Sequence, residues 1–283
     1  MRKFGLIGHP LGHSLSPQIH TRLFELSGET VDYQLYDIAP EELADKHDFL
    51  KSLDGFNITI PHKVEIISYC DRLSEGAQRY RSVNCVANGA EKVGYNTDVM
   101  GFTKSIEMMG ASLGSNVLLI GCGGVGRMMA IETALSGGKL TIAALKSDEA
   151  LAQQAVKEIK DKKPDADVRI VFINNGALSL SDFEGDIPQT DLLVNACPVG
   201  MYPKSDRMPC TPEVLEGVKF VFDAIYNPRE TLLARTAREK GAKAMTGMAM
   251  LVLQAVAAHE IWDNATYNKE DIDKLISDME ALV

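Results

Sequence analysis

A glycine-rich loop between a buried strand and a helix is the feature that most limits how this chain can fold. The apolar run Asn116–Ile120 leads directly into Gly121-Cys-Gly-Gly-Val-Gly126, and a helical pattern follows over Arg127–Ser136. In such a loop the first glycine permits a tight turn, the second lets backbone approach a pyrophosphate, and the third allows close helix packing. Free N–H groups at the helix start also attract an anion. The pattern predicts a Rossmann-type dinucleotide-binding unit, and a purely structural glycine turn is the alternative.

The end of the next predicted strand bears on which dinucleotide binds. NAD-binding units of this kind place a carboxylate about 20 residues beyond the glycines, where it holds the ribose. Here the strand ends in Ala143-Ala144-Leu145-Lys146-Ser147, which contains no carboxylate. Lys146 and Ser147 are placed to receive a 2′-phosphate, although a lysine here is equally typical of a solvated loop. The missing carboxylate favours NADP, and NAD stays as the alternative.

Strand and helix patterns alternate along most of the chain, which predicts an α/β fold with mostly parallel sheets. One set of patterns ends before residue 99 and a new set begins at Ser115, so the 283 residues are expected to form two domains. The last helical segments, Gly247–Trp262 and Glu270–Ala281, have no following strand. We therefore expect a discontinuous α/β substrate-binding and catalytic domain (1–100 and 247–283), a Rossmann-type dinucleotide-binding domain (101–246), and an active site in the cleft between them.

The expected elements follow from apolar periodicity and turn residues. In the first set, the expected strands are Lys3–Gly8, Val31–Asp37, Gly55–Ile60, Asn84–Ala87 and Lys92–Tyr95, and the expected helices are Pro17–Leu26, Pro40–Leu50 and Ser74–Tyr80. A helix over Val99–Met109 precedes the second set, in which further strands are expected at Leu140–Ala144, Val168–Ile173, Leu192–Ala196 and Lys219–Ala224.

The run Asn57-Ile-Thr-Ile-Pro-His-Lys63 predicts a site in the first domain. Pro61 cannot donate to a sheet ladder and fits the first turn of a helix, so Lys63 should lie just past the carboxyl end of a strand. Open α/β sheets bind their ligands at such ends, and Asn57 and Thr59 should face the same side. We expect Lys63 to meet Asp98, of Asn96-Thr-Asp98, as a proton-transfer pair, and His62 to point to solvent.

Four further polar residues have both a structural and a functional interpretation. Ser16 fits a helix N-cap before Pro17, but Ser14 and Ser16 at a helix start also suit a carboxylate. Asn84 and Gln254 each lie in an apolar segment and need hydrogen-bond partners, for which a packing network is the commoner explanation. When several such residues face one cleft, a ligand becomes the simpler explanation.

Three histidines near the N-terminus do not predict a metal site. Pro10 and Gly12 break the helix that would align His9 with His13, and no cysteine or carboxylate neighbour completes a ligand set with His20. We expect no bound metal.

Charge and cysteine usage exclude several classes of protein. A net charge of −10 opposes binding to nucleic acid, although small anions need only a local positive potential. The five cysteines form no CxxC pair, and an odd count is a poor disulfide framework. The N-terminal apolar run is too short for a signal peptide, and Met248–Ala258 is too short to span a membrane. We expect a cytoplasmic protein that acts on a small molecule, without a membrane partner.

Together these motifs resemble the shikimate dehydrogenase family, including its quinate/shikimate members. The match runs through nearly the whole chain, and several separated motifs in the right order are more specific than any one of them. They are Ser14-Leu-Ser-Pro17, Asn57-Ile-Thr-Ile-Pro-His-Lys63, Val83-Asn84, Asn96-Thr-Asp98, the glycine loop at 121–126, Asn195-Ala-Cys-Pro-Val-Gly-Met201, Asp223-Ala-Ile-Tyr-Asn-Pro228, and Gly247 with Gln254-Ala255.

The resemblance implies an oxidoreductase that interconverts 3-dehydroshikimate and shikimate, with quinate and 3-dehydroquinate as a further pair, by hydride transfer with a nicotinamide cofactor. It implies that Lys63 and Asp98 are catalytic. The substrate carboxylate would be held by Ser14, Ser16 and Tyr226, and the ring hydroxyls by Thr59, Asn84, Asp98 and Gln254. The cofactor would contact Gly121, Cys122, Gly123, Gly124, Val125, Lys146, Ala224 and Gly247.

One departure from the family bears on the cofactor. The NADP enzymes of the family usually carry Asn-Arg-Thr where this chain has Ala144, Leu145 and Lys146. An arginine grips phosphate with a planar fork, whereas a lysine supplies only a point charge. Two alternatives stay open: a catalytically weak metabolite-binding regulator, and a dehydrogenase of a related hydroxylated ring acid such as aminoshikimate. The family includes monomers and homodimers, and either state is compatible with the sequence.

Overall fold

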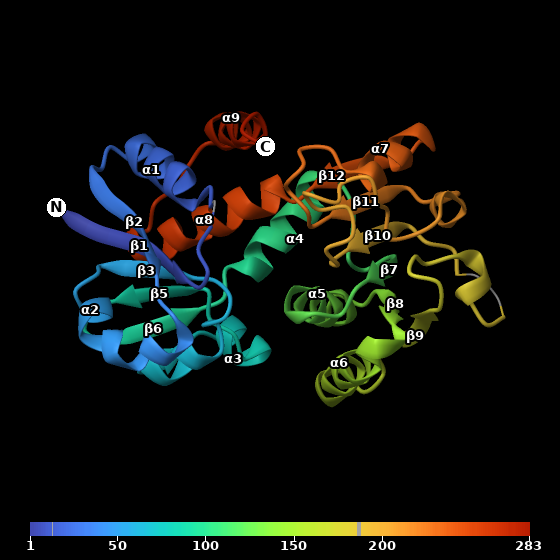
Figure 1. The fold of residues 1–283 in the computed structure, drawn as a ribbon, viewed down its shortest axis with the longest axis horizontal. Helices are drawn as coiled ribbons and strands as arrows, with labels where there is room; N and C mark the ends of the chain where they lie inside the picture. Colours follow the sequence, from blue (N-terminus) through green and yellow to red (C-terminus); the bar gives the residue numbers. More distant parts are fainter. Residues whose placement is uncertain (13, 186–187) are drawn as a thin grey trace. The chain divides into compact units, whose positions relative to one another are not determined.

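The computed structural model describes residues 1–12, 14–185 and 188–283, which form two compact units (Figure 1). The first unit contains Met1–Gly101 and Leu251–Met279, and the second contains Phe102–Met250 and Glu280–Val283. The chain leaves the first unit within α4 (Asp98–Met108) and returns to it within α8 (Met248–Asp263). The first unit is therefore discontinuous in sequence, and the indole N–H of Trp262 on α8 donates to the carbonyl of Val86 at 3.0 Å.

The first unit is built on a six-stranded sheet in the order β2-β1-β3-β5-β6-β4. Its β1 pairs in parallel with β2 and with β3, whereas β5 is antiparallel to both β3 and β6, so the expected strands Asn84–Ala87 and Lys92–Tyr95 form a hairpin. The core contains buried aromatic and aliphatic side chains such as Phe4, Phe24 and Phe56. The strands are β1 (Arg2–Gly8), β2 (Val31–Asp37), β3 (Gly55–Ile58), β4 (Arg72–Leu73), β5 (Cys85–Asn88) and β6 (Lys92–Tyr95).

Two segments of this unit that were expected to form α-helices, Pro40–Leu50 and the segment that begins at Pro61, form mainly turns and 3₁₀ helices. Instead of one helix over Pro40–Leu50, the chain forms η1 (Pro40–Glu42), η2 (Ala44–Lys46) and the short α2 (His47–Lys51). Leu43 and Leu50 of this segment are buried in the core and Phe49 packs against it, and these contacts are too few to stabilise one long helix. After β3 the chain makes a turn over residues 60–64 and then η3 (Glu65–Tyr69), not an α-helix. The other helices are α1 (Ser16–Leu26), α3 (Glu75–Tyr80) and α9 (Lys269–Glu280).

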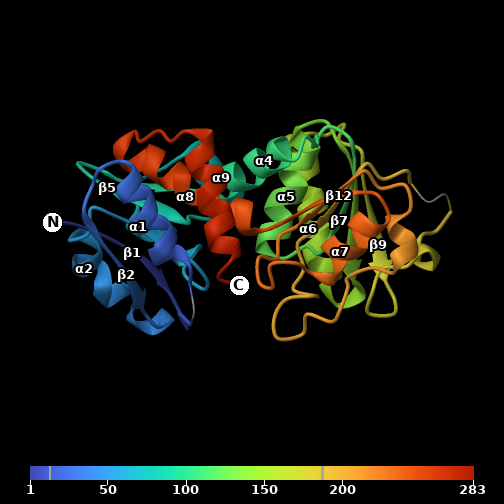
Figure 2. The same ribbon diagram turned by 90° about the horizontal axis from the view of Figure 1, so that it is seen from above.

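The second unit contains a wholly parallel six-stranded sheet in the order β12-β11-β10-β7-β8-β9. The glycine loop joins β7 to α5, and α5 lies beside α6 in both views (Figures 1 and 2). The predicted Rossmann-type architecture is confirmed. The elements are β7 (Asn116–Ile120), α5 (Gly124–Leu135), β8 (Lys139–Leu145), η4 (Lys146–Asp148), α6 (Glu149–Lys162), β9 (Val168–Ile173), η5 (Leu180–Asp182), β10 (Leu192–Asn195), η6 (Pro212–Leu215), β11 (Phe220–Asp223), α7 (Leu232–Glu239) and β12 (Lys243–Thr246).

The edge strand β12 was missed by the sequence analysis. Its four residues include no buried apolar side chain, and only Thr246 is buried. A short edge strand of this kind carries no apolar run by which to recognise it. Within the described residues, no helix combines the length and the apolarity needed to cross a bilayer.

Candidate active site

Lys63 and Asp98 meet in the first unit, as predicted. The Lys63 ammonium Nζ donates to Asp98 Oδ2 at 2.7 Å, although the two residues are thirty-five positions apart in the chain. Lys63 lies in the turn after β3, and Asp98 is the first residue of α4. The two side chains are 23% and 17% exposed, so the pair is shielded but still accessible to a small ligand.

The second oxygen of the Asp98 carboxylate is held by Asn84. The Asn84 side-chain Nδ2 donates to Asp98 Oδ1 at 2.9 Å, and the backbone N–H of Asp98 donates to Asn96 Oδ1 at 3.2 Å. Asn84 is 2% exposed, and its own Oδ1 accepts from the backbone N–H of Thr97 at 2.6 Å. Asp98 therefore has both oxygens fixed, one by a cation and one by a neutral amide.

Thr97 is a buried link that the sequence analysis did not assign. Its side chain is fully buried, and its Oγ1 lies 3.0 Å from Asn84 Nδ2 and 3.3 Å from Gln254 Oε1. Gln254 belongs to α8 and also donates from Nε2 to the carbonyl of Leu251 at 2.9 Å. Thr97 thus joins two predicted substrate-binding residues, and its place between Asn96 and Asp98 was the available signal.

Two expectations for the segment before Lys63 need correction. Asn57 is 4% exposed, and both ends of its amide are hydrogen-bonded. Its Oδ1 accepts from the Tyr33 hydroxyl at 2.8 Å, and its Nδ2 donates to the Asn84 carbonyl at 3.3 Å. Asn57 therefore anchors the strand and does not face a ligand. His62 is 1% exposed, with Nε2 2.7 Å from the carbonyl of Ile38, so the solvent-facing prediction is wrong. The turn after β3 folds back so that His62 points inward, while Thr59 stays half-buried.

Ser14 and Ser16 lie at the start of α1, but their capping roles differ from the prediction. Ser16 is the first helical residue, Leu15 occupies the N-cap position, and no side chain caps the helix there. Instead, Ser14 Oγ accepts from the backbone N–H of Ser16 at 3.2 Å. Ser14 is half-buried and Ser16 is buried, so the N-cap does not account for either hydroxyl.

The histidines near the N-terminus have other partners. His9 Nδ1 lies 2.7 Å from Asp37 Oδ1, and the buried His20 Nδ1 lies 3.1 Å from His259 Nε2. Burial lowers the pKa of both His20 and His259, the latter to about 3. His13 lies outside the described residues. Among the residues that are described, no cluster of three or more histidine, cysteine or carboxylate side chains is suited to a metal.

The glycine loop of the second unit leaves space where a pyrophosphate must approach. A Cβ at Gly121, where φ is +96°, would lie 2.9 Å from the Cβ of Cys197, and one at Gly126 would lie 2.3 Å from the Gly121 carbonyl oxygen. At Gly123 and Gly124 a Cβ would meet no atom within 4 Å. Two glycines are therefore required by packing, and two leave the start of α5 open to an anion, which fits a dinucleotide.

The remaining predicted residues of this loop contribute differently. Cys122 is 3% exposed, burial raises the pKa of its thiol to about 11, and its neutral Sγ donates to the Leu151 carbonyl at 3.8 Å. Val125 is 38% exposed at the first turn of α5.

The end of β8 contains a lysine that already has partners. Lys146 Nζ lies 2.8 Å from Glu149 Oε2 and 4.3 Å from the centre of the Phe172 ring. Leu145, at the position where the family usually has arginine, is 42% exposed and offers no charge. Among the described residues Leu145 therefore supplies no phosphate clamp at this point, and Glu149 competes with a phosphate for Lys146.

Ala224, Tyr226 and Gly247 share the sheet edge of the glycine loop. Ala224 and Tyr226 follow the carboxyl end of β11, and Gly247 follows that of β12. In the sheet, β12, β11, β10 and β7 are successive neighbours, and the glycine loop follows the carboxyl end of β7. The N–H of Gly247 donates to the Ile225 carbonyl at 2.9 Å, and a Cβ at Gly247 would lie 2.1 Å from the Ala224 carbonyl oxygen. Burial raises the pKa of Tyr226, which is half-buried.

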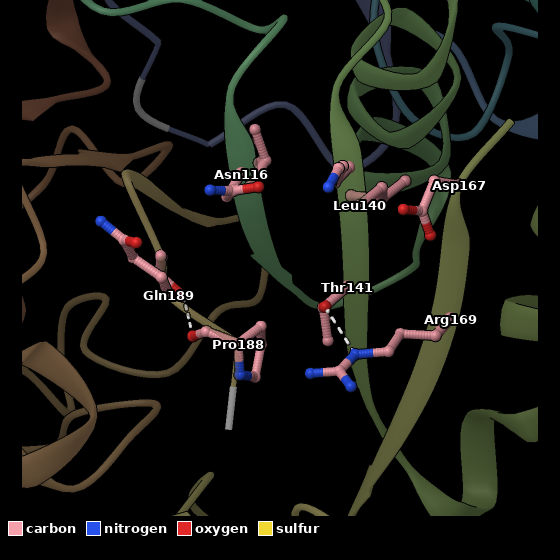
Figure 3. Close-up of a pocket in the computed structure, with 10 residues that line it drawn as sticks. Asn116, Leu140, Thr141, Asp167, Arg169, Pro188 and Gln189 are labelled. Atoms are coloured by element: carbon pink, nitrogen blue, oxygen red, sulfur yellow. Dashed lines mark hydrogen bonds between the residues drawn. The ribbon is translucent and has the colours of Figure 1, made fainter. Parts of the chain in front are cut away.

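A cavity of about 320 Å³ lies elsewhere in the second unit (Figure 3). Asn116, Lys139 and Asp167 line it from the amino-terminal ends of β7, β8 and β9, and Arg169 donates from Nε to Thr141 Oγ1 at 3.1 Å within it. Open parallel sheets bind dinucleotides at the opposite, carboxyl ends of their strands. This cavity is therefore separate from the predicted cofactor site.

Comparisons with known proteins agree with the motifs. A model of the shikimate dehydrogenase substrate binding domain matches residues 6–86. The shikimate dehydrogenase (NADP(+)) of Caldanaerobacter subterraneus subspecies tengcongensis is 36% identical over 275 residues, which cover 94% of this chain and 93% of that protein.

Solved structures show the same likeness in three dimensions. A shikimate dehydrogenase in complex with NADP⁺ aligns with a TM-score of 0.83 at 35% identity, over 98% of this chain and 95% of that one. The shikimate 5-dehydrogenase of Listeria monocytogenes, in complex with shikimate and NAD, aligns with a TM-score of 0.87 at 28% identity, over 98% and 96% of the two chains. The resemblance inferred from the motifs is confirmed: this chain belongs to the shikimate dehydrogenase family.

Proposed function

We propose that this protein is an oxidoreductase that interconverts shikimate and 3-dehydroshikimate with NADP as the cofactor. The observation that carries the proposal is the ion pair between Lys63 Nζ and Asp98 Oδ2 at 2.7 Å, which is partly shielded but accessible. Family membership supplies the reaction, and this pair supplies a group able to give and take its proton.

Substrate binding is assigned to the first unit together with Tyr226 of the second, and the dinucleotide to the second unit, close to the predicted domains of residues 1–100 with 247–283 and 101–246. The match of residues 6–86 to a substrate binding domain and the open glycine loop support this assignment. We assign the substrate carboxylate to Ser14, Ser16 and Tyr226, and the ring hydroxyls to Thr59, Asn84, Asp98 and Gln254. The predicted cleft between the units stays a prediction.

The protein's part in the reaction is to orient the substrate and to move one proton. A bound nicotinamide supplies or accepts the hydride. Lys63 Nζ carries three hydrogens, of which one is engaged by Asp98, so the others are free for the oxygen of the reacting carbon. Lys63 donates the proton when the ketone is reduced and accepts it when the alcohol is oxidised. Asn84 keeps Asp98 in place, and Lys63 acts either as the sole acid or by sharing the proton with Asp98.

Recognition of NADP divides between two parts of the second unit. Gly121–Val125 and the start of α5 would hold the pyrophosphate, with Ala224 and Gly247 at the nicotinamide side. Lys146 and Ser147 would contact the 2′-phosphate, but Glu149 engages one hydrogen of the Lys146 ammonium and its negative charge opposes a phosphate there. We therefore expect NADP to bind with a weaker 2′-phosphate contact than an arginine would give.

The absence of an arginine at the end of β8 is compatible with a second function. A metabolite-binding regulator without turnover would retain the substrate residues and need no strong 2′-phosphate contact. Quinate and aminoshikimate are alternative substrates for the same first unit. We retain a cytoplasmic location within this proposal, supported by five free cysteines, which are typical of reducing compartments.

One assay tests the function. The purified chain is incubated with shikimate, quinate or aminoshikimate and with NADP⁺ or NAD⁺, and the absorbance of the reduced nicotinamide is followed. We expect the highest kcat/KM with shikimate and NADP⁺. Turnover only with another ring acid would replace the substrate, and binding of shikimate without any turnover would favour the regulator.

A further inference from the structure

A buried carboxylate in the second unit has no part in the mechanism above. Asp223 is the last residue of β11 and is fully buried, as is its neighbour Asn195, the last residue of β10. The two residues are paired across the parallel strands. Burial raises the pKa of the Asp223 carboxyl to about 6, although hydrogen bonds from Thr231, Ile225 and Asn195 oppose the rise. At neutral pH the group is therefore mostly an anion, and its hydrogen-bond partners among the described residues are all uncharged.

Three uncharged donors hold this carboxylate. Asn195 Nδ2 and the backbone N–H of Ile225 donate to Oδ1 at 2.9 and 3.1 Å, and Thr231 Oγ1 donates to Oδ2 at 2.7 Å. Each donor belongs to a different segment: the end of β10, the loop after β11, and the N-cap of α7. Asp223 thus ties three segments to one point at the carboxyl edge of the sheet.

The partners cannot turn away from Asp223 without losing other bonds. Thr231 Oγ1 also accepts from the backbone N–H of Ala234 at 3.1 Å, so its own hydrogen is directed to the carboxylate. Asn195 Oδ1 also accepts from the backbone N–H of Cys197 at 3.1 Å, which fixes the orientation of its amide. The network therefore requires an acceptor at Oδ1, where both partners can only donate, and Thr231 favours an acceptor at Oδ2.

The loop that Asp223 holds carries predicted cofactor contacts. Ile225 is 6% exposed and turns inward, whereas Ala224 and Tyr226 are half-buried and lie on the outer side of the loop. The Ile225 carbonyl accepts from Gly247, whose missing Cβ allows close contact with Ala224. A shift of the Ile225 N–H would therefore move Ala224 and Gly247 together.

We propose that Asp223 is a positioning residue for the dinucleotide, which fixes the loop Ala224–Tyr226 through its bonds to Asn195, Ile225 and Thr231. The inference rests on the proposed function, because it takes Ala224 and Gly247 as cofactor contacts. An asparagine at 223 fits the same space, but its NH₂ group must face either Thr231 or the pair of N–H donors. The loop then adopts a different position, and NADP⁺ binds more weakly.

The test measures the Kd of NADP⁺ by titration calorimetry, with circular dichroism to verify folding. We expect Asp223→Asn and Thr231→Val to raise Kd by about tenfold or more, and Thr231→Ser, which keeps the hydroxyl, to stay within about twofold of wild type. The matched control is Asp182→Asn, which alters another buried carboxylate of the same unit, held by Asn174 and Ser179. It should leave Kd unchanged.

A folded Asp223→Asn variant with the wild-type Kd would overturn the inference, and so would an equal rise in Asp182→Asn. If Asp223→Asn does not fold, the comparison of Thr231→Val with Thr231→Ser decides by the same criterion. A wild-type protein that binds NADP⁺ but does not oxidise shikimate would refute the proposed function alone. A wild-type protein that does not bind NADP⁺ would overturn the positioning role as well.

Discussion

Replacement of Lys63 by alanine separates a proton-transfer role from a binding role. In the wild-type protein Lys63 Nζ donates to Asp98 Oδ2, and Asp98 Oδ1 is independently held by Asn84. The substitution therefore removes the amine but leaves the carboxylate in place through its amide partner. Because Asp98 is 17% exposed, water can replace the lost ammonium, and the fold should tolerate the change.

The expected magnitude follows from the role. General acid–base catalysis by a positioned group contributes about 10²–10⁴-fold, or about 3–5 kcal/mol of transition-state stabilisation. Lys63→Ala should therefore lower kcat by that factor and change the shikimate KM by less than about threefold. A residue that only binds the ground state would instead give up a hydrogen bond of about 1.5–3 kcal/mol, which is about 10- to 150-fold in KM.

Steady-state kinetics in both directions, with reduced nicotinamide absorbance as the readout, distinguishes the two roles. The matched control is Lys92→Ala, since Lys92 Nζ pairs with Asp71 Oδ1 at the same 2.7 Å in the same unit and its side chain is 24% exposed. Lys92→Ala should leave both kcat and KM unchanged. A raised KM with an intact kcat in Lys63→Ala would refute the proton-transfer assignment.

Three further outcomes are expected. Glu149→Gln should release Lys146 and lower the Kd of NADP⁺, but not of NAD⁺, by about threefold in calorimetry, the scale of an exposed ion pair. Gly123→Ala should weaken NADP⁺ binding about tenfold without loss of stability, whereas Gly126→Ala should lower the melting temperature, because only the latter Cβ meets backbone. Burial lowers the pKa of His259 to about 3, so the unfolded state takes up its proton first as pH falls below about 6.5. The stability that neutral His259 contributes above that pH should decline by about 2 kcal/mol between pH 7 and 5 in urea unfolding, in addition to a decline from His20, whose pKa burial also lowers. His259→Phe should remove the His259 part of the decline.

The parts of the fold that sequence could predict are those with a strong local pattern. The run Asn116–Ile120, the glycines after it and the helix behind them were predicted, because the loop must turn tightly at Gly121 and the helix must pack closely at Gly126. The prediction of one helix over Pro40–Leu50 was wrong because few side chains of the segment, chiefly Leu43 and Leu50, hold it to the core. Strand β12 was missed because an edge strand owes its conformation to pairing with β11, which is not a local property.

In the site, too, residues with a local sequence signal were predicted, whereas contacts with distant parts of the chain were not. The pairing of Lys63 with Asp98 was predicted correctly. Lys63 follows the end of a strand and Asp98 begins a helix, and both positions can be recognised from the local sequence. His62 was wrong because the turn after β3 folds inward toward Ile38, a contact between residues 24 positions apart. Ser16 was wrong as an N-cap because α1 begins one residue earlier than Pro17 implied. The hydrogen-bonded role of Thr97 depends on Gln254 from the far end of the chain, which no local pattern reveals.

Both units place a buried polar residue close to the carboxyl end of a strand, ahead of the proposed functional residues. Asn57 in β3 bonds to Tyr33 and to the Asn84 backbone, and Thr59 and Lys63 follow it. Asp223 in β11 bonds to Asn195, and Ala224 and Tyr226 follow it. A buried polar group that lacked such bonds would cost about 1–3 kcal/mol, so each residue is stable only when the neighbouring strand end is in register. Asn57 and Asp223 therefore fix the loops that follow them relative to the sheet. This explains how side chains on irregular segments can be held in fixed positions.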